Sequence, residues 1–169
     1  FRSKKILFNW RSTMRINLDN FYKLGFIFII FLLFEYSLLY ASESKLESTK
    51  LKDIWREAIE KNRNLDSYGA LKEWTKAIDI APNNHYLFYN RGLTYSKLQL
   101  LSQAIKDFDE SIKLKPDFAP AFADRGMAYY ELDQKDRACD DFKKSAKLKN
   151  KRAIIWIKDT QRSYWCIKK

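Results

Sequence analysis

The side chains that could carry out chemistry are few in this chain, and their spacing does not assemble an active site. His85 is the only histidine, so neither a catalytic triad nor a histidine-based metal site can be built. The sequence has no phosphate-binding glycine loop, no dinucleotide motif and no Cys-x-x-Cys pair. Neighbouring acids fit the polar surface of amphipathic helices: Asp107, Asp109 and Glu110, and Asp140 with Asp141. We therefore predict a protein that is not an enzyme and that needs no cofactor and no metal.

The two cysteines, Cys139 and Cys166, are the remaining reactive side chains. We expect Cys139 on a helix that ends shortly before Lys151, and Cys166 near the end of the closing helix that follows. At about 1.5 Å per residue, two antiparallel helices would place them within roughly one turn of each other along the axis. In an exported protein this spacing favours a disulfide that staples the closing helix. The alternative is two unrelated buried thiols.

Composition limits the elements that can position these residues. The chain has 169 residues, 46% of them apolar, with only four Gly and three Pro. This is too little Gly and Pro for a fold built from strands and tight turns, so we predict an all-α fold of one compact domain plus an appendage. The net charge of +11 comes from the two ends of the chain, whereas the middle is close to neutral.

The appendage is N-terminal. Residues 1–23 are basic, and residues 24–41 form a hydrophobic stretch that only Glu35 interrupts. This pattern is typical of a cleaved export signal or of a retained membrane anchor, and both readings stay open because Leu39 is large for a cleavage site while Glu35 is costly in a spanning helix. Met14 is an alternative start. In either case the basic flank predicts an exported or single-pass membrane protein with residues 42–169 on the non-cytoplasmic side.

The sequence repeats itself with a period of 34 residues. Twelve residues of one segment recur in the next without a gap: Phe88, Arg91, Gly92, Tyr95, Leu98, Ala104, Asp107, Phe108, Ser111, Lys113, Leu114 and Lys115 become Phe122, Arg125, Gly126, Tyr129, Leu132, Ala138, Asp141, Phe142, Ser145, Lys147, Leu148 and Lys149. A weaker copy precedes them, with Ile54, Ala58, Ala70, Trp74, Ala77 and Pro82 at matching positions. The small residues predict close helix pairs, over 47–62 with 66–80, 85–98 with 102–115, and 119–132 with 136–149.

This pattern resembles the tetratricopeptide repeat family. The resemblance covers residues 42–150 as three repeats, at about 51–84, 85–118 and 119–152, followed by a basic capping helix over 151–169 that buries Trp156. It implies stacked antiparallel helix pairs, an α-solenoid. The sequence departs from the family where Arg91 and Arg125 replace a usual Leu, where Lys61 replaces a Tyr, and where Asn150 replaces a Pro.

The resemblance also implies a concave face lined by the first helix of each pair. The residues it places there are Trp55, Ile59, Tyr86, Tyr89, Asn90, Leu93, Met127 and Tyr130. Aromatic and amide groups suit a peptide ligand, although several of these side chains could instead pack only between helices. Some family members hold a C-terminal carboxylate here with Lys, Arg and Asn. Only Asn90 fits that set, whereas Trp55, Ile59, Pro120 and Asp124 do not.

Two functional hypotheses follow. The first is a non-catalytic protein- or peptide-binding scaffold or assembly factor that uses the concave face. The second is a membrane-surface adaptor that docks on anionic lipid or on an acidic protein complex through a basic C-terminal face. That face consists of Lys143, Lys144, Lys147, Lys149, Lys151, Arg152, Lys158 and Arg162, which could equally be a solvated surface. The near-neutral middle of the chain argues against nucleic acid as a partner.

Overall fold

The computed structural model describes residues 18–159, 164 and 166, with side chains from residue 29 onward. Most of the basic segment 1–23, including Met14, lies outside the described residues, as does Arg162. The described residues form seven helices and no strand, which confirms the predicted all-α fold. The helices are α1 (Leu18–Arg63), α2 (Ser67–Ile80), α3 (His85–Lys97), α4 (Leu101–Leu114), α5 (Ala119–Glu131), α6 (Lys135–Lys147) and α7 (Lys151–Lys158).

The chain divides into two compact units, residues 1–46 and residues 47–169. The described part of the first unit is helical and belongs to α1. Its large apolar side chains between Ile29 and Tyr40 are exposed. Within the residues described, no helix combines the length and the apolar character that crossing a membrane requires.

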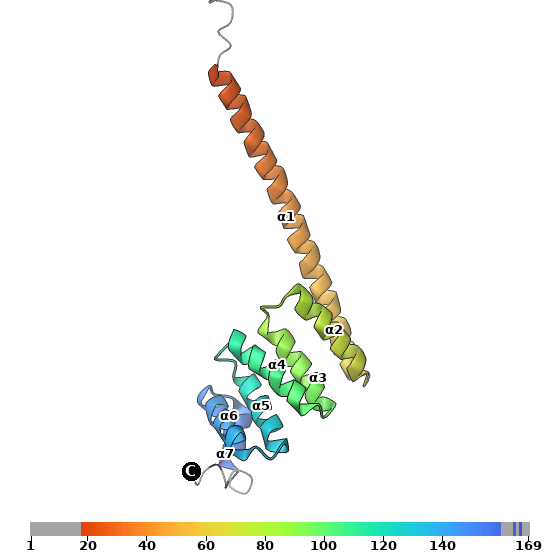
Figure 1. The fold of residues 1–169 in the computed structure, drawn as a ribbon, viewed down its shortest axis with the longest axis vertical. Coiled ribbons are helices and arrows are strands. Elements are labelled where there is room, and N and C mark those ends of the chain that lie inside the picture. The colour runs from red at the N-terminus through yellow and green to blue at the C-terminus, as the bar shows by residue number, and fades with distance from the viewer. Residues whose placement is uncertain (1–17, 160–163, 165, 167–169) are drawn as a thin grey trace, which may run out of the picture. The chain divides into compact units, whose positions relative to one another are not determined.

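The second unit is a series of helix pairs (Figure 1). Helix α3 packs on α4 and α5 packs on α6. These two pairs contact each other through α4 and α5, and α2 contacts α3. At the start of the series, Ala58 from α1 joins Ala70, Trp74 and Ala77 from α2 and Leu87 from α3 in one buried cluster. The predicted helix pairs are therefore confirmed, and the first helix of the first pair is the C-terminal part of α1.

Small residues let the helices of each pair approach closely. A Cβ atom added to Gly92 would lie 2.8 Å from Cε1 of the buried Phe108, whereas one added to Gly126 would meet its nearest atom, Cβ of Asp141, at 3.1 Å. The ring of Phe108 is fully buried, so it cannot move aside without disturbing its neighbours. The same glycine position is thus tighter in the second repeat than in the third.

This difference predicts effects of different size on stability for two matched substitutions. Gly92→Ala should lower the free energy of unfolding by about 1–2 kcal/mol, because overpacking outweighs the gain in helix propensity. Gly126→Ala should change it by less than about 0.5 kcal/mol, because the two effects nearly cancel there. Urea unfolding followed by tryptophan fluorescence measures both. Equal effects at the two sites would contradict the difference in packing.

Three of the four described non-glycine residues with positive φ recur with the same 34-residue period. Leu65, Gln99 and Asp133 have φ of 66°, 60° and 57° and end the first helix of each repeat. The next amide in each case donates to a carbonyl five residues back, as Leu100 N does to Tyr95 O at 2.9 Å. This closure is the Schellman motif, which glycine favours because a Cβ atom is unfavourable at positive φ.

Leu65→Gly should therefore stabilise the protein. Leu65 is 78% exposed, so removal of its side chain loses little packing. Glycine relieves the unfavourable left-handed conformation but also adds entropy to the unfolded chain. The net effect should raise the free energy of unfolding by about 0.5–1 kcal/mol. The matched control is Lys72→Gly, at an exposed helical position, which should lower it by about 1 kcal/mol. Thermal unfolding of the two variants would reveal opposite signs; a destabilising Leu65→Gly would contradict the prediction.

The second helices end in two different ways. Ala81 and Lys115 precede prolines and leave the helical conformation, with φ of −132° and −141°, because a proline disfavours that conformation in the residue before it. In the third repeat, where Asn150 stands in place of the proline, Lys149 instead adopts a φ of 64°. The Asn150 side chain then accepts a hydrogen bond from Ala153 N at 3.1 Å. The departure from the family pattern at Asn150 thus provides the N-cap of α7.

The capping segment covers the end of the series. Trp156 of α7 stacks on Phe142 of α6, with ring centroids 3.8 Å apart. Cys139 and Cys166 are joined by a disulfide beside this pair, and both are buried. The prediction of one helix over 151–169 is wrong, because α7 ends at Lys158 and Asp159 is extended. A negative side chain at a helix C-terminus opposes the helix dipole, which favours an end at this point.

Candidate functional site

An exposed apolar ladder runs along the first helices of the three repeats. Ile59, Leu93 and Met127 occupy equivalent positions, 34 residues apart, and are 42%, 36% and 40% exposed. Exposed large apolar side chains at one repeated position form a continuous stripe, because consecutive repeats stack with a constant offset. We call these three residues the apolar ladder.

Tyrosines from α3 and α5 lie on the same helices as the ladder. Tyr86 and Tyr130 are 45% and 37% exposed. Tyr86 and Tyr89 both pack edge-on against Phe118, with ring centroids 5.2 Å and 5.1 Å apart. Tyr130 contacts Trp156 at 6.0 Å. Five of the eight residues expected on the concave face are therefore exposed. Two of these five, Tyr86 and Tyr130, also pack against the aromatic rings of Phe118 and Trp156.

The other three expected residues serve packing and polar contacts. Trp55 is half-buried and meets Trp74 edge-on at 5.4 Å. Asn90 donates from its amide nitrogen to Tyr86 O at 2.7 Å, within its own helix. Tyr89 donates its hydroxyl hydrogen bond to Asp124 at 2.7 Å. Burial, and then the neighbouring Asp124 carboxylate, raise the pKa of Tyr89 above its usual value, so it remains a neutral donor.

Asp124 links the last two repeats to the capping helix. It accepts the hydrogen bond of Tyr89 from α3, and both of its oxygens accept from Nη2 of Arg152, at 2.8 Å and 2.9 Å. The sequence assigned Arg152 to the basic face, but the structure pairs it with this aspartate. From the sequence, Asp124 is only a poor match to a carboxylate-binding set. Its role as a link could not be predicted, because its partners come from helices distant in the sequence.

Two small pockets lie near the two ends of the ladder. The first has a volume of about 250 Å³ and is lined by Ile59, Asn62, Trp74, Asn90, Leu93, Thr94 and Lys97. The second has a volume of about 110 Å³ and is lined by Ala123, Asp124, Met127, Phe142, Arg152 and Trp156. Sequence reasoning missed Asn62, Thr94 and Lys97. Each lies three or four residues after a predicted concave-face residue, so helical periodicity was the signal that could have found them.

Family models of the tetratricopeptide repeat match residues 85–118 and residues 119–152. The structure also resembles the first TPR domain of Spaghetti (RPAP3) bound to the HSP90 peptide SRMEEVD, with a TM-score of 0.63 and 21% identity over 69% of this chain and 94% of that one. The chain is a tetratricopeptide repeat protein. The resemblance inferred from the 34-residue period is thereby confirmed.

Other tetratricopeptide repeat domains are similar in structure. The second TPR domain of human RPAP3, in complex with the HSP70 peptide SGPTIEEVD, has a TM-score of 0.61 and 26% identity, over 64% of this chain and 92% of that one. The Sgt2 TPR domain from Aspergillus fumigatus has a TM-score of 0.62 and 18% identity, over 68% and 79%. No curated protein sequence matches the chain.

Buried ion pairs replace part of the usual apolar packing of the tetratricopeptide repeat. Arg91 donates to both carboxylate oxygens of Asp107 at 2.8 Å, and Arg125 donates to those of Asp141 at 2.8 Å and 2.7 Å. Both aspartates are 5% exposed. Each arginine also reaches the preceding repeat, where Arg91 donates to Thr75 and Arg125 to Asp109. These two acceptors are again 34 residues apart, so the arginines fix the register of neighbouring repeats.

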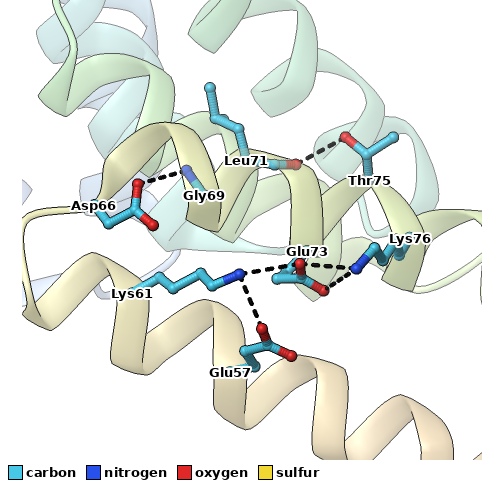
Figure 2. Close-up of polar contacts among 8 residues, drawn as sticks. All are labelled: Glu57, Lys61, Asp66, Gly69, Leu71, Glu73, Thr75 and Lys76. Carbon is cyan, nitrogen blue, oxygen red and sulfur yellow. Dashed lines mark hydrogen bonds and ion pairs between the residues drawn. The ribbon is translucent and has the colours of Figure 1, made fainter.

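In the first repeat, lysines take the place of the arginine as partners of the buried acid. Glu57 and Glu73 occupy the positions of the arginine and the aspartate, so the pair would consist of two acids. Nζ of Lys61, which replaces the usual tyrosine, lies 2.9 Å from Oε1 of Glu57 and 3.2 Å from Oε1 of Glu73 (Figure 2). Nζ of Lys76 lies 2.8 Å from Oε2 of Glu73. The departure at Lys61 therefore compensates for the acid at residue 57.

This cluster predicts an acid-sensitive contribution to stability. Burial acts to raise the pKa of Glu73, but hydrogen bonds from Lys76 and Lys61 outweigh it, so the pKa lies below its usual 4.5. A lowered pKa means that the carboxylate stabilises the fold fully above about pH 4.5, and that this contribution is lost as pH falls through the folded pKa. Glu73→Gln should be less stable than the wild type at pH 7, with a difference that shrinks below pH 4.5.

Urea midpoints measured from pH 7 to pH 3 test this prediction. Glu110→Gln is the matched control, since Glu110 pairs with Lys113 on the exposed surface. Its difference from the wild type should stay within about 0.5 kcal/mol at every pH. A Glu73→Gln difference that is independent of pH would contradict an ionised, ion-paired Glu73.

The proposed basic face is only partly described. Its exposed members are Lys143, Lys144, Lys147, Lys149, Lys151, Arg152 and Lys158, of which Arg152 pairs with Asp124. Lys144 lies over the ring of Phe122, 5.9 Å from its centroid. No group of three or more His, Cys, Asp or Glu side chains that could hold a metal ion occurs in the part of the chain that the structure describes.

Proposed function

We propose that this tetratricopeptide repeat protein is a non-catalytic scaffold or assembly factor that binds a peptide segment of another protein along the apolar ladder. The observation that carries this proposal is the exposure of Ile59, Leu93 and Met127 at one repeated position. Three apolar anchors at a regular spacing suit an extended or helical peptide that places its own apolar side chains at intervals. The similar RPAP3 domains bind chaperone peptides, which supports a peptide as the ligand.

The charge on this face argues for a different peptide from those chaperone tails. The side chain of Asp124 is 15% exposed and occupies a position where a carboxylate-binding family member needs a polar or basic group. Its own partner Arg152 and the hydroxyl of Tyr89 already satisfy it. At Asp124 a peptide ending in acidic residues would meet a carboxylate whose cationic partner, Arg152, is already engaged, so we propose a ligand that is apolar and not acidic where it contacts α5.

The test uses peptides selected from a random display library against the full chain. Binding of the tightest peptides is then measured by fluorescence anisotropy for Leu93→Glu and Met127→Glu. Each variant should bind at least about tenfold more weakly, because a charge would replace an apolar contact. Leu65→Glu is the matched control, since Leu65 is exposed in a turn outside the ladder. Unchanged affinity in both ladder variants would overturn the proposal.

The same peptides separate the two functional hypotheses. Binding through the apolar ladder should vary little between 50 mM and 500 mM salt, whereas docking through the lysines of α6 and α7 should weaken steeply. Lys143→Glu with Lys147→Glu should leave peptide binding intact. If this double variant abolishes binding and the ladder variants do not, the basic-face adaptor is the correct function.

We also propose that residues 42–169 act on the non-cytoplasmic side, as an exported or membrane-attached domain. The basic flank before residues 24–41 supports this location, and so does the burial of a disulfide between Cys139 and Cys166, since disulfides persist in oxidising compartments. Thiol labelling of the native protein, before and after reduction, tests it together with membrane fractionation. Freely labelled cysteines in a cytosolic fraction would overturn the location.

A further inference from the structure

The pocket of about 250 Å³ beside the ladder holds buried polar groups that packing alone does not explain. Ile59 and Leu93 supply apolar contacts at this pocket, while Asn62, Trp74 and Thr94 contribute polar atoms. Within the described residues, two buried side-chain atoms of the lining have no hydrogen-bond partner: Oδ1 of Asn62 and Nε1 of Trp74. A buried polar atom without a partner costs free energy, so such atoms indicate a site for a ligand or for water.

The hydrogen bonds of Thr94 fix which end of the Asn62 amide is free. The Thr94 hydroxyl donates its only hydrogen to Asn90 O at 2.9 Å. Towards Asn62 it can therefore only accept, and it does so from Nδ2 at 2.8 Å. Asn62 must consequently keep Oδ1 as its unpaired group, which is an acceptor. Lys97 holds the backbone at this point by donating to Asn62 O at 2.9 Å.

Trp74 supplies the complementary group. Its side chain is 1% exposed, and its indole nitrogen can only donate a hydrogen bond. The residues that line the pocket therefore carry one unpaired donor and one unpaired acceptor, both buried, beside the apolar side chains of Ile59 and Leu93. The two groups do not satisfy each other, because neither has a partner.

We propose that this pocket binds an amide group, with Trp74 donating to the amide oxygen and Asn62 Oδ1 accepting from the amide N–H. The proposal rests on the peptide-binding function and identifies the chemistry recognised at this end of the ladder. A carboxylate offers only acceptors and would face Oδ1 of Asn62, and a hydrocarbon would leave both groups unpaired. The amide can belong to a peptide backbone or to the side chain of Asn or Gln.

Four probes of similar size and shape separate these possibilities. Isovaleramide carries a primary amide like Asn and Gln, N-methylisovaleramide carries a secondary amide like the backbone, methyl isovalerate is an ester that can only accept, and isovalerate is a carboxylate. Each is titrated into the ¹⁵N-labelled full chain, and the indole N–H signals are followed by NMR. The Trp74 signal should shift, whereas the signal of Trp156, which lines the second pocket, reports separately on any binding there.

At least one amide should bind about tenfold more tightly than the ester and the carboxylate, because only an amide also donates to Asn62. The stronger of the two amides identifies a side chain or a backbone as the source. Equal binding of amide and ester, or no movement of the Trp74 signal with either amide, would overturn the inference. The comparison uses the wild type, so it does not depend on the folding of a variant.

A variant adds an independent check. Trp74→Phe keeps a ring in the core but removes the donor to the carbonyl oxygen, so it should weaken the binding of the amides and of the ester alike. The outcome is distinguishable from failure of the proposed function. Selected peptides that require Leu93 and Met127 but bind Trp74→Phe normally would preserve the peptide-binding function and refute the amide pocket.

Discussion

Arg125→Met is expected to lower the free energy of unfolding by about 3–5 kcal/mol, because it leaves the buried carboxylate of Asp141 without its partner. Arg125 donates to both oxygens of this carboxylate, and Asp141 is 5% exposed. The variant also loses the bond to Asp109 in the preceding repeat. Urea unfolding at pH 7 measures the effect. The exposed pair of Lys113 and Glu110 provides the control, since Lys113→Met should cost less than about 1 kcal/mol.

The dependence of this effect on pH identifies its cause. Burial raises the pKa of Asp141 above its usual 3.8, and Arg125 opposes that rise. Without Arg125 the folded pKa rises further, so the variant gains stability relative to the wild type as pH falls through that value and the carboxylate becomes neutral. Replacing both residues by apolar ones, Arg125→Met with Asp141→Leu, should recover most of the loss. A deficit that is the same at pH 4 and pH 7, with no recovery in the double variant, would refute an electrostatic cause.

Reduction of the bond between Cys139 and Cys166 is expected to lower the free energy of unfolding by about 3 kcal/mol, because it frees a loop that the disulfide closes in the unfolded chain. The two residues are 27 positions apart. The loss of stability should be largest in α6 and α7, because each repeat is stabilised mainly by its neighbours and α7 packs chiefly on α6. Amide hydrogen exchange should therefore accelerate in α6 and α7 before α3 and α4.

The control for this experiment is the variant Cys139→Ala with Cys166→Ala. Reductant should change the stability of the wild type and leave that of the double variant unaltered. If reductant has no effect on the wild type, the disulfide does not stabilise the cap. Exchange that accelerates equally in all helices would show that the repeats unfold as one cooperative unit.

The 34-residue period was sufficient to predict the fold of the repeats. The recurrence of Gly92, Ala104 and Phe108 at Gly126, Ala138 and Phe142 defined the helix pairs, because close helix packing requires small residues opposite large ones. The ends of α2 to α6 lie within two residues of those predicted from the same period, whereas α1 begins at Leu18 and not at residue 47. The absence of a catalytic constellation and the location of the domain remain predictions.

Which candidate residues are available to a partner depends on contacts between helices, and the sequence could not show these contacts. Helical spacing places Trp55, Tyr89 and Ile59 on similar faces, but Trp55 packs on Trp74 and Tyr89 bonds to Asp124, while Ile59 stays exposed. The pairing of Arg152 with Asp124 and the unpaired atoms of Asn62 and Trp74 depend on contacts between separate helices. A repeat period specifies what each unit contributes, whereas burial and hydrogen bonding depend on what the neighbouring unit places opposite it.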